Sequence, residues 1–309
     1  MNHMSLPRAC RCVPSPRAQR ITLHLRRPAG SRRYGSLVGR EPKPGRVQPL
    51  VLDLSFVTWS PSQYNRFAAE REQPFWDLVG LLEPTSAPEV VDLGCGDGRL
   101  TAALSDRLAG SHALGIDSSA EMLANAKAYT RPGLLFEQAD LATWAGRADV
   151  VFANASLHWV PDHPTVLGRW REGLRPGGQL AVQVPTNADH PSHLVSAELG
   201  EEWLGADSPP DPVAANVLPP ETYACLLDQL GFVRQHVRLQ VYGHHLGSSS
   251  DVVEWVKGTS LTRFRPLMEP EAFDRFVSEY RRRLVDRLGD RRPYFYAFKR
   301  ILFWGRLEA

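Results

Sequence analysis

The chain has 309 residues, of which 43% are hydrophobic, and it carries 36 basic and 34 acidic side chains. This length and apolar fraction predict one large or two small globular domains and exclude a largely disordered chain. No apolar run reaches the roughly 18 residues that a membrane-spanning helix needs, so we expect no membrane partner.

The charge is distributed unevenly along the chain. Residues 1–56 hold 11 basic and two acidic residues, whereas the remainder holds 25 basic and 32 acidic ones. Because the remainder is mildly acidic, we expect no nucleic acid as its partner. The four cysteines lack the spacing of a metal site or a disulfide framework. We therefore expect no metal and a reducing, cytoplasmic location. We also expect a monomer, although no motif in the sequence addresses the oligomeric state.

Residues 1–56 form a basic leader that is rich in Arg, Pro, Ser and Gly and has no helical or strand period. Three interpretations compete for it. It is an organellar transit segment, a basic arm that contacts nucleic acid, or not part of the native product, with translation beginning at Val57. We favour the third, because recognisable folded sequence begins at Thr58.

Strand and helix patterns alternate from about residue 60 to residue 185. Ser60 and Pro61 are typical of a helix start and open a predicted helix that extends over 63–81. Ser118 and Glu121 form a predicted capping box for a helix that ends near residue 129, and residues 176–178 (Pro-Gly-Gly) predict a tight turn. Further helices are predicted at 99–108 and 165–174, and strands at Glu89–Leu93, His112–Asp117, 134–137, 149–152 and 179–184. Such alternation is typical of a parallel sheet with helices on both faces.

The pattern changes after Pro185. Residues 186–220, rich in Pro, Asp and His, are predicted to form an insertion or lid with a helix near 192–204, and residues 243–290 a second lid segment. The last helix, Pro270–Leu288, places Phe273, Phe276, Tyr280 and Leu284 on one stripe. The other predicted elements here are helices at 223–230 and 250–258 and strands at 233–242 and 294–307.

The glycine-rich turn after the first predicted strand is the most informative stretch. Residues 90–98 read Val-Val-Asp-Leu-Gly-Cys-Gly-Asp-Gly. Glycines let the backbone approach a ligand closely, and the helix that follows directs its N–H groups at that ligand. Asp117 ends the second strand, 23 positions after Gly94, where its carboxylate can accept hydrogen bonds from ribose hydroxyls. We therefore expect a nucleoside-bearing cofactor.

The spacing of the glycines narrows the choice of cofactor. The dinucleotide fingerprint is G-x-G-x-x-G, whereas this chain has G-x-G-x-G with Asp92 ahead of it. A carboxylate there suits a cationic ligand with an ammonium group and would repel a pyrophosphate. The run resembles the first motif of S-adenosylmethionine-dependent methyltransferases, which implies S-adenosyl-L-methionine as the cofactor. The expected cofactor-binding residues are Asp92, Gly94, Cys95, Gly96, Asp117, Ser118, Met122, Asp140, Leu141 and Asn154.

Other segments resemble one family within this class, the trans-aconitate 2-methyltransferases. They are residues 59–64 (Trp-Ser-Pro-Ser-Gln-Tyr), residues 152–163, residues 180–185 and the aromatic tail from Tyr294. The resemblance extends from Val57 to the end. It implies a class I methyltransferase domain over 57–309, an α/β Rossmann-like fold with a seven-stranded, mostly parallel sheet and an antiparallel last strand. It also implies esterification of a carboxylate of trans-aconitate or a similar small polycarboxylic acid, giving the monomethyl ester and S-adenosylhomocysteine.

This chemistry needs no general base, because a carboxylate is already ionised near pH 7, and we expect no catalytic acid–base residue. A polycarboxylate does need cations, and arginine matches a carboxylate best. The expected substrate-binding residues are Tyr64, Arg71, His158, Trp159 and Arg263. Further available candidates are Arg265, Lys299, Arg300, His244 and His245.

Two alternatives remain open. The first is a methyltransferase for another small molecule, a malonyl thioester or a natural product; a neutral acceptor would leave inward-facing arginines unpaired at a cost. The second is an S-adenosylmethionine-binding protein without catalysis. The intact Asp92, Gly94, Gly96 and Asp117 argue against the second.

Overall fold

The computed structural model describes residues 68–309, and their side chains from residue 72 onward. The predicted leader, the start of the helix predicted over 63–81 and the candidate Tyr64 lie outside the described residues.

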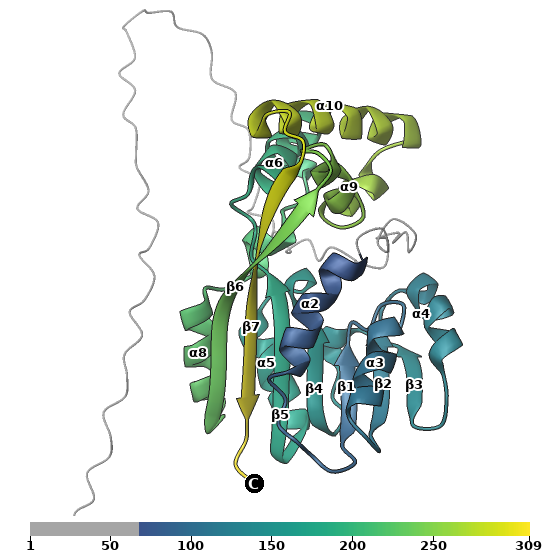
Figure 1. The fold of residues 1–309 in the computed structure, drawn as a ribbon, viewed down its shortest axis with the longest axis vertical. Coiled ribbons are helices and arrows are strands. Elements are labelled where there is room, and N and C mark those ends of the chain that lie inside the picture. The colour runs from purple at the N-terminus through teal and green to yellow at the C-terminus, as the bar shows by residue number, and fades with distance from the viewer. Residues whose placement is uncertain (1–67) are drawn as a thin grey trace, which may run out of the picture. The chain divides into compact units, whose positions relative to one another are not determined.

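Seven strands form one sheet in the order β3-β2-β1-β4-β5-β7-β6 (Figure 1). The first five strands pair in parallel, and β7 runs antiparallel to both β5 and β6. The predicted mostly parallel sheet with an antiparallel last strand is confirmed. The strands are β1 (Glu89–Leu93), β2 (His112–Asp117), β3 (Leu134–Gln138), β4 (Ala148–Asn154), β5 (Leu174–Pro185), β6 (Arg234–Leu246) and β7 (Tyr294–Arg306).

Helices follow the strands in the predicted alternation. The α-helices are α2 (Ala68–Val79), α3 (Arg99–Arg107), α4 (Ala120–Ala126), α5 (His163–Gly173), α6 (Pro191–Leu204), α7 (Pro212–Asn216), α8 (Pro220–Gln229), α9 (Asp251–Lys257) and α10 (Pro270–Leu288). The 3-10 helices are η2 (Lys127–Tyr129), η3 (Leu141–Thr143), η4 (Leu157–Trp159), η5 (Gly205–Asp207) and η6 (Ser260–Leu267). None of the helices in the described part is both long and apolar enough to cross a bilayer.

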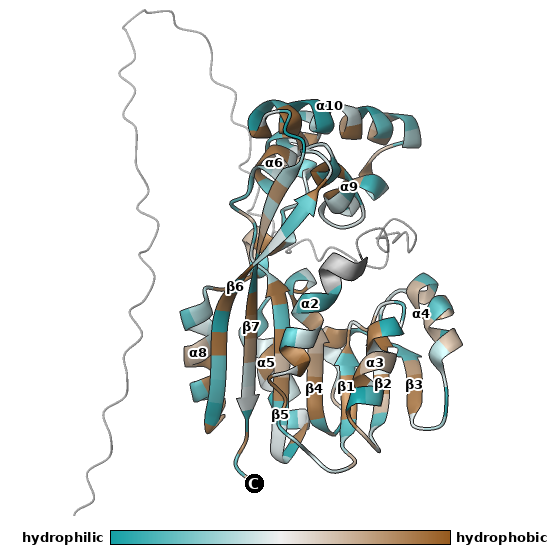
Figure 2. Cartoon of the chain, in the orientation of Figure 1, coloured by the Kyte–Doolittle hydropathy of each residue, from teal (hydrophilic) through white to brown (hydrophobic). Residues whose placement is uncertain are grey.

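Both faces of the sheet are covered, because alternate residues of a strand point to opposite sides. On one face Val151 of β4 packs in a cluster with Trp170 of α5 and Tyr223 of α8. On the other face Phe152 packs with Phe75 of α2. In Figure 2 apolar residues predominate along the parallel strands, as burial on both faces requires.

A third hydrophobic cluster lies beyond the carboxyl end of β5. It joins α6, α9, η6 and α10 to the outer halves of β6 and β7 (Figure 1). The predicted stripe on α10 faces this cluster, and Phe276, Tyr280 and Leu284 are fully buried. The two predicted lid segments are therefore packed into one apolar core.

Two local predictions are wrong. Residues 176–178 lie within β5 instead of preceding it, in a stretch where the pairing with β4 shifts register. The end of the chain holds this stretch in the sheet, since Gly177 N donates to Glu308 O at 2.6 Å and Leu307 N donates to Gly178 O at 2.9 Å. The backbone bends at Gly177, whose φ angle is 70°. The cap of α4 is Ser119, whose hydroxyl accepts from Met122 N at 3.2 Å, and not Ser118.

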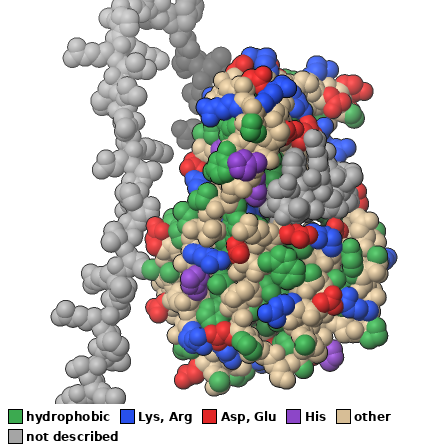
Figure 3. Space-filling model, in the orientation of Figure 1, with side chains coloured by type: hydrophobic (Ala, Val, Ile, Leu, Met, Phe, Trp, Pro, Cys, Tyr) green, Lys and Arg blue, Asp and Glu red, His purple; other side chains and the backbone are tan. Residues whose placement is uncertain are grey.

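Charged side chains of both signs are interspersed over the face drawn in Figure 3. Several are paired across elements, as in the contacts of Arg283 on α10 with Glu202 on α6 and of Arg287 with Glu198. These pairs cover the outer side of the third cluster.

Candidate active site

The strand order reverses between β1 and β4, because β2 and β3 lie to one side of β1 and β5 to the far side of β4. In open α/β sheets, ligands bind at the carboxyl ends of the strands at such a point. The predicted cofactor-binding residues follow or end β1, β2, β3 and β4, so the fold brings them to this edge.

The glycine loop after β1 uses its three glycines for two different purposes. All three have left-handed φ angles, 85° at Gly94, 58° at Gly96 and 78° at Gly98. A Cβ atom on Gly94 would lie 2.2 Å from Cβ of Ser156, and one on Gly98 would lie 2.7 Å from Cβ of Ala126. A Cβ on Gly96 would meet nothing within 4 Å. The outer glycines therefore allow the fold to close, and the middle one faces open space that can hold a ligand.

Asp117 fixes the loop to the end of β2. Its Oδ2 atom accepts from Gly96 N and its Oδ1 atom from Ser119 N, both at 2.9 Å. Burial raises the pKa of Asp117, while the backbone N–H groups act in the opposite direction. Each carboxylate oxygen has a further lone pair, so the side chain can also accept hydrogen bonds from ribose hydroxyls.

Asp92 is directed away from the loop opening. Its side chain is buried on β1 and accepts a hydrogen bond from Thr101 Oγ1 on α3 at 2.6 Å. Burial raises the pKa of Asp92 to about 7, although the bond from Thr101 lowers it. A direct contact of this carboxylate with a ligand ammonium remains a prediction.

The next three predicted cofactor residues surround the loop through backbone or packing. Cys95 is buried, and its backbone N donates to Ile116 O at 2.9 Å. Met122 is buried on α4. Ser118 is exposed, and its carbonyl accepts from Gln138 Nε2 at 2.9 Å.

Asp140, Leu141 and Asn154 lie after β3 and at the end of β4. Asp140 is exposed and caps η3 by accepting from Ala142 N at 2.8 Å. The Leu141 side chain lies 3.5 Å from the position of a Cβ on Gly94, so it borders the loop. Asn154 Oδ1 is buried and has no hydrogen-bond partner among the described residues, which leaves an acceptor for a ligand.

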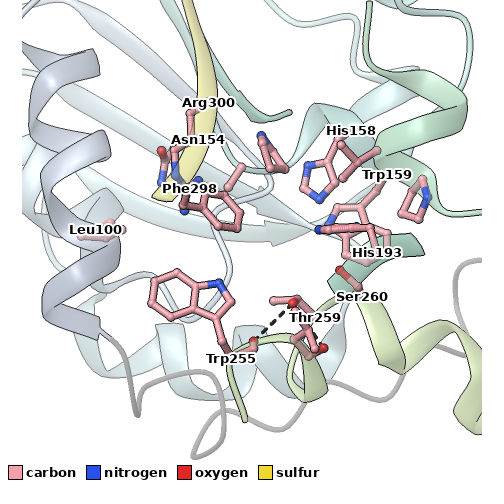
Figure 4. A pocket seen from close by; sticks show the side chains of 15 residues that line it. Leu100, Asn154, His158, Trp159, His193, Trp255, Thr259, Ser260, Phe298 and Arg300 are labelled. Atoms are coloured by element: carbon pink, nitrogen blue, oxygen red, sulfur yellow. Dashed lines mark hydrogen bonds between the residues drawn. The ribbon is translucent and has the colours of Figure 1, made fainter. Parts of the chain in front are cut away.

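Next to Asn154 is a pocket with about 750 Å³ of empty space, part of it open to solvent. It extends from the edge of the sheet to the third cluster (Figure 4). Its lining residues are Leu100, Asn154, Ala155, His158, Trp159, Pro185, His193, Pro212, Val213, Trp255, Val256, Thr259, Ser260, Phe298 and Arg300.

Arg300 is the arginine in this lining. It is 6% exposed, and its Nη1 atom donates to Gln183 Oε1 at 3.1 Å. Its guanidinium also lies over the ring of Phe298, 4.8 Å from the centroid. Both contacts help to fix the orientation of the guanidinium.

His158 and Trp159 line the pocket, with ring centroids 4.9 Å apart, and their expected contact with the substrate remains a prediction. Burial and the charge of Arg300 lower the pKa of His158 to about 3. Its Nδ1 atom is buried without a hydrogen-bond partner among the described residues. His158 is therefore neutral near pH 7 and offers a ligand a hydrogen bond but no charge.

The structure does not place Arg263 in the pocket lining. It is buried behind the lining, where it donates to Ser196 Oγ at 2.9 Å and lies 3.5 Å from Asp211 Oδ2. Arg71 lies on α2, but its side chain is outside the described part. Their predicted role as substrate contacts remains a prediction.

Sequence reasoning missed the prominence of Arg300, Phe298, Trp255 and His193 in the pocket. In the sequence, Arg300 was one of several candidate cations. The alternation of side chains between the two faces of β7 could have indicated that Arg300 is on the buried side of this strand. Tyr294, Tyr296, Phe298 and Arg300 are buried, whereas the intervening Phe295 and Ala297 are exposed and Lys299 is half-buried. No comparable local signal distinguishes His193.

Comparisons with known proteins agree with this arrangement. The sequence model of the family described as "Methyltransferase domain" matches residues 34–237. The chain is 42% identical to the trans-aconitate 2-methyltransferase of Deinococcus radiodurans, over 80% of this chain and 97% of that protein. It is 36% identical to the trans-aconitate 2-methyltransferase of Streptomyces avermitilis, over 82% of this chain and 98% of that protein. Phosphoethanolamine N-methyltransferase 2 of Haemonchus contortus, solved with S-adenosyl-L-methionine, matches with a TM-score of 0.51 at 15% identity, over 80% of this chain and 56% of that one. The last likeness concerns the fold alone.

We expect Gly96→Ala and Gly98→Ala to separate ligand binding from stability. In Gly96→Ala the methyl group enters the open space, so affinity for S-adenosylhomocysteine should fall at least about tenfold, while the left-handed backbone costs about 1–2 kcal/mol. Gly98→Ala should lose more unfolding free energy, because its methyl group meets Ala126 and Phe136. Calorimetric titration and urea unfolding measure the two effects. Wild-type affinity in Gly96→Ala would place the ligand elsewhere.

We expect Asp92→Asn to stabilise the ligand-free protein more at pH 7 than at pH 5. The folded pKa is about 7 and the ordinary value is 3.8, so the wild-type fold binds a proton more tightly than the unfolded chain and loses stability as pH rises through this window. Asparagine does not titrate, and its advantage should grow by about 2 kcal/mol between the two pH values. Urea unfolding measures it, with Asp228→Asn, at an exposed position, as the control. An equal difference at both pH values would contradict a buried, protonated Asp92.

Proposed function

Because the chain belongs to the trans-aconitate 2-methyltransferase family, we propose that it transfers a methyl group from S-adenosyl-L-methionine to a carboxylate of trans-aconitate or a similar small polycarboxylic acid. The observation that carries the proposal is a buried arginine, Arg300, in a pocket that begins at the end of β4 beside the glycine loop. Methyl donor and anionic acceptor would thus meet at Asn154.

The residues at the strand ends fit the cofactor. Gly96 borders open space, and a side chain at this position would occupy part of the volume that the cofactor needs. Asn154 Oδ1 is a buried acceptor without a hydrogen-bond partner in the described part of the chain. Asp117 would hold the ribose hydroxyls, and Asp140 with Leu141 would border the adenine. When bound, S-adenosyl-L-methionine supplies an electrophilic methyl group on a sulfonium.

The transfer balances without a proton. A lone pair of the carboxylate oxygen forms a bond to the methyl carbon, the carbon–sulfur bond breaks, and its electron pair stays on sulfur. A carboxylate anion and a sulfonium cation become a neutral ester and a neutral thioether, so no group of the chain has to accept a proton. This agrees with a lining in which His158, with a pKa of about 3, is too weak a base to accept a proton near pH 7.

The chain would accelerate this reaction by positioning and by excluding water. Holding the two reacting atoms at near-attack distance can supply up to ~7–11 kcal/mol. Trp159, Trp255 and Phe298 make much of the pocket wall apolar, which strips water from the nucleophilic carboxylate. Arg300, which lines the pocket, would bind a carboxylate that is not methylated.

We propose a cytoplasmic enzyme, as the cysteine usage and the lack of an apolar span in the sequence suggest. We also propose that it is a monomer. Gel filtration of the pure protein tests the oligomeric state.

The function is tested by incubating the protein with labelled S-adenosyl-L-methionine and a panel of acids: trans-aconitate, citrate, isocitrate, cis-aconitate, malonate and malonyl-coenzyme A. We expect the label in a monomethyl ester, with trans-aconitate the preferred acceptor. Transfer to malonyl-coenzyme A alone would favour the alternative acceptor. Binding of S-adenosylhomocysteine without transfer to any acid would favour a non-catalytic binding protein.

Arg300→Met should raise the KM for the acid about 10- to 100-fold, because it removes a charge-assisted contact. The KM for the cofactor should change little. Lys299→Met is the matched control on the same strand, since Lys299 faces away and pairs with Asp189 at 2.5 Å. Steady-state kinetics with each substrate varied in turn measure both. Equal effects of the two substitutions would contradict the role of Arg300.

A further inference from the structure

His193 on α6 faces the pocket from the side opposite Arg300 in Figure 4. Its side chain is 4% exposed, so it reaches the pocket from a buried position. Within the described part of the chain, its side-chain hydrogen bond is the one between Nδ1 and Asp211 Oδ2, at 2.8 Å. The Nε2 atom is therefore the ring nitrogen that remains for a ligand.

Asp211 is an ionised partner for this histidine. Burial alone would raise the pKa of Asp211, but the hydrogen bond and charge of His193 and the charge of Arg263 lower it to about 2. An ionised carboxylate only accepts hydrogen bonds, so Nδ1 of His193 is the donor. The same carboxylate caps α7 by accepting from Val213 N at 2.9 Å.

Arg263 contacts Asp211 and stabilises the charge of its carboxylate. Its Nη1 atom lies 3.5 Å from Asp211 Oδ2, and it also donates to Ser260 O at 2.5 Å and to Ser196 Oγ at 2.9 Å. Three segments thus converge on one buried charge cluster: α6 with His193, the start of α7 with Asp211, and η6 with Arg263.

Whether Nε2 of His193 accepts or donates a hydrogen bond in the pocket depends on whether the ring is neutral or an imidazolium. When the ring is neutral, Nδ1 keeps the proton for Asp211, and Nε2 offers a lone pair that would repel a carboxylate. When the ring is an imidazolium, Asp211 stabilises it and Nε2–H can donate to a carboxylate. The cluster then carries one net positive charge, because Arg263 and Asp211 offset each other.

We propose that His193 binds, as an imidazolium, one of the carboxylates of the acid that is not methylated, and that Asp211 and Arg263 position it. Arg300 and His193 then hold two carboxylates of the acid from opposite sides of the pocket, and the remaining one is left for the methyl group. This proposal rests on the proposed function and adds the group that recognises a tricarboxylate. Arg263 thereby acts on the substrate through Asp211 and His193.

The variants are His193→Gln, Asp211→Asn and their combination. Asparagine keeps the cap of α7, since it is as good a capping residue as aspartate. His190→Asn is the matched control, because His190 caps the same helix α6 and lies outside the pocket lining. Far-ultraviolet circular dichroism and the affinity for S-adenosylhomocysteine show that each variant is folded.

Each variant, loaded with S-adenosylhomocysteine, is titrated with trans-aconitate and with three dicarboxylates that each lack a different carboxylate of it: itaconate, mesaconate and (Z)-glutaconate. His193→Gln should weaken trans-aconitate binding about 10- to 100-fold and Asp211→Asn about tenfold. The double variant should be no weaker than His193→Gln, because Asp211 acts through His193. The control should bind as the wild type does, and kcat in His193→Gln should stay within about threefold.

The dicarboxylates separate a contact from a general disturbance. His193→Gln should weaken two of them and leave unchanged the one that lacks the carboxylate bound by His193. Equal weakening of all four acids, or of none, would overturn the proposal. A wild-type protein that methylates no acid would instead reject the proposed function.

Discussion

The pocket depends on how β7 divides its hydrogen bonds between two neighbours. From Arg306 to Arg300 this strand pairs with β5 on one side and β6 on the other. At Arg300 its pairing with β5 ends opposite Pro185, and beyond this point β7 pairs with β6 alone. The two-stranded ribbon carries the third hydrophobic cluster past the edge of the sheet. Arg300 lies at the branch, so its side chain is fixed by the sheet while it faces the space enclosed by the cluster.

Three buried basic side chains near this branch differ in how the protein accommodates their charge. Arg263 is paired with Asp211, Arg300 is held by Gln183 and Phe298, and His158 is kept neutral. Burying a cation costs free energy unless an anion compensates it. The compensation for Arg263 is built into the fold. An anionic ligand would provide additional compensation for Arg300 in the pocket.

The fold and the expected cofactor site at the carboxyl edge of the sheet could be predicted because their sequence signals are local. Three glycines with left-handed φ angles and an aspartate at the next strand end specify the loop within a short stretch of sequence. The cap of α4 was missed by one residue, since Ser118 and Ser119 are adjacent and only the backbone angles decide between them. Residues 176–178 were misread because the chain end, more than a hundred residues later, holds them in the sheet. The part of the pocket that is proposed to bind the acid is harder to predict. The segments that carry Arg263 and His193 have no hydrophobic periodicity that indicates their contacts. For Arg300, only the alternation of buried and exposed residues along β7 is a signal.

The residues that we expect to hold the cofactor lie before residue 155, whereas His193, Trp255 and Arg300 of the pocket lining all follow the fifth strand. The expected donor site and much of the proposed acceptor site thus lie on separate stretches of the chain. Substitutions downstream of β5 would therefore change the proposed acceptor site and leave the expected donor site intact. A laboratory library confined to residues 186–300 would exploit the same separation.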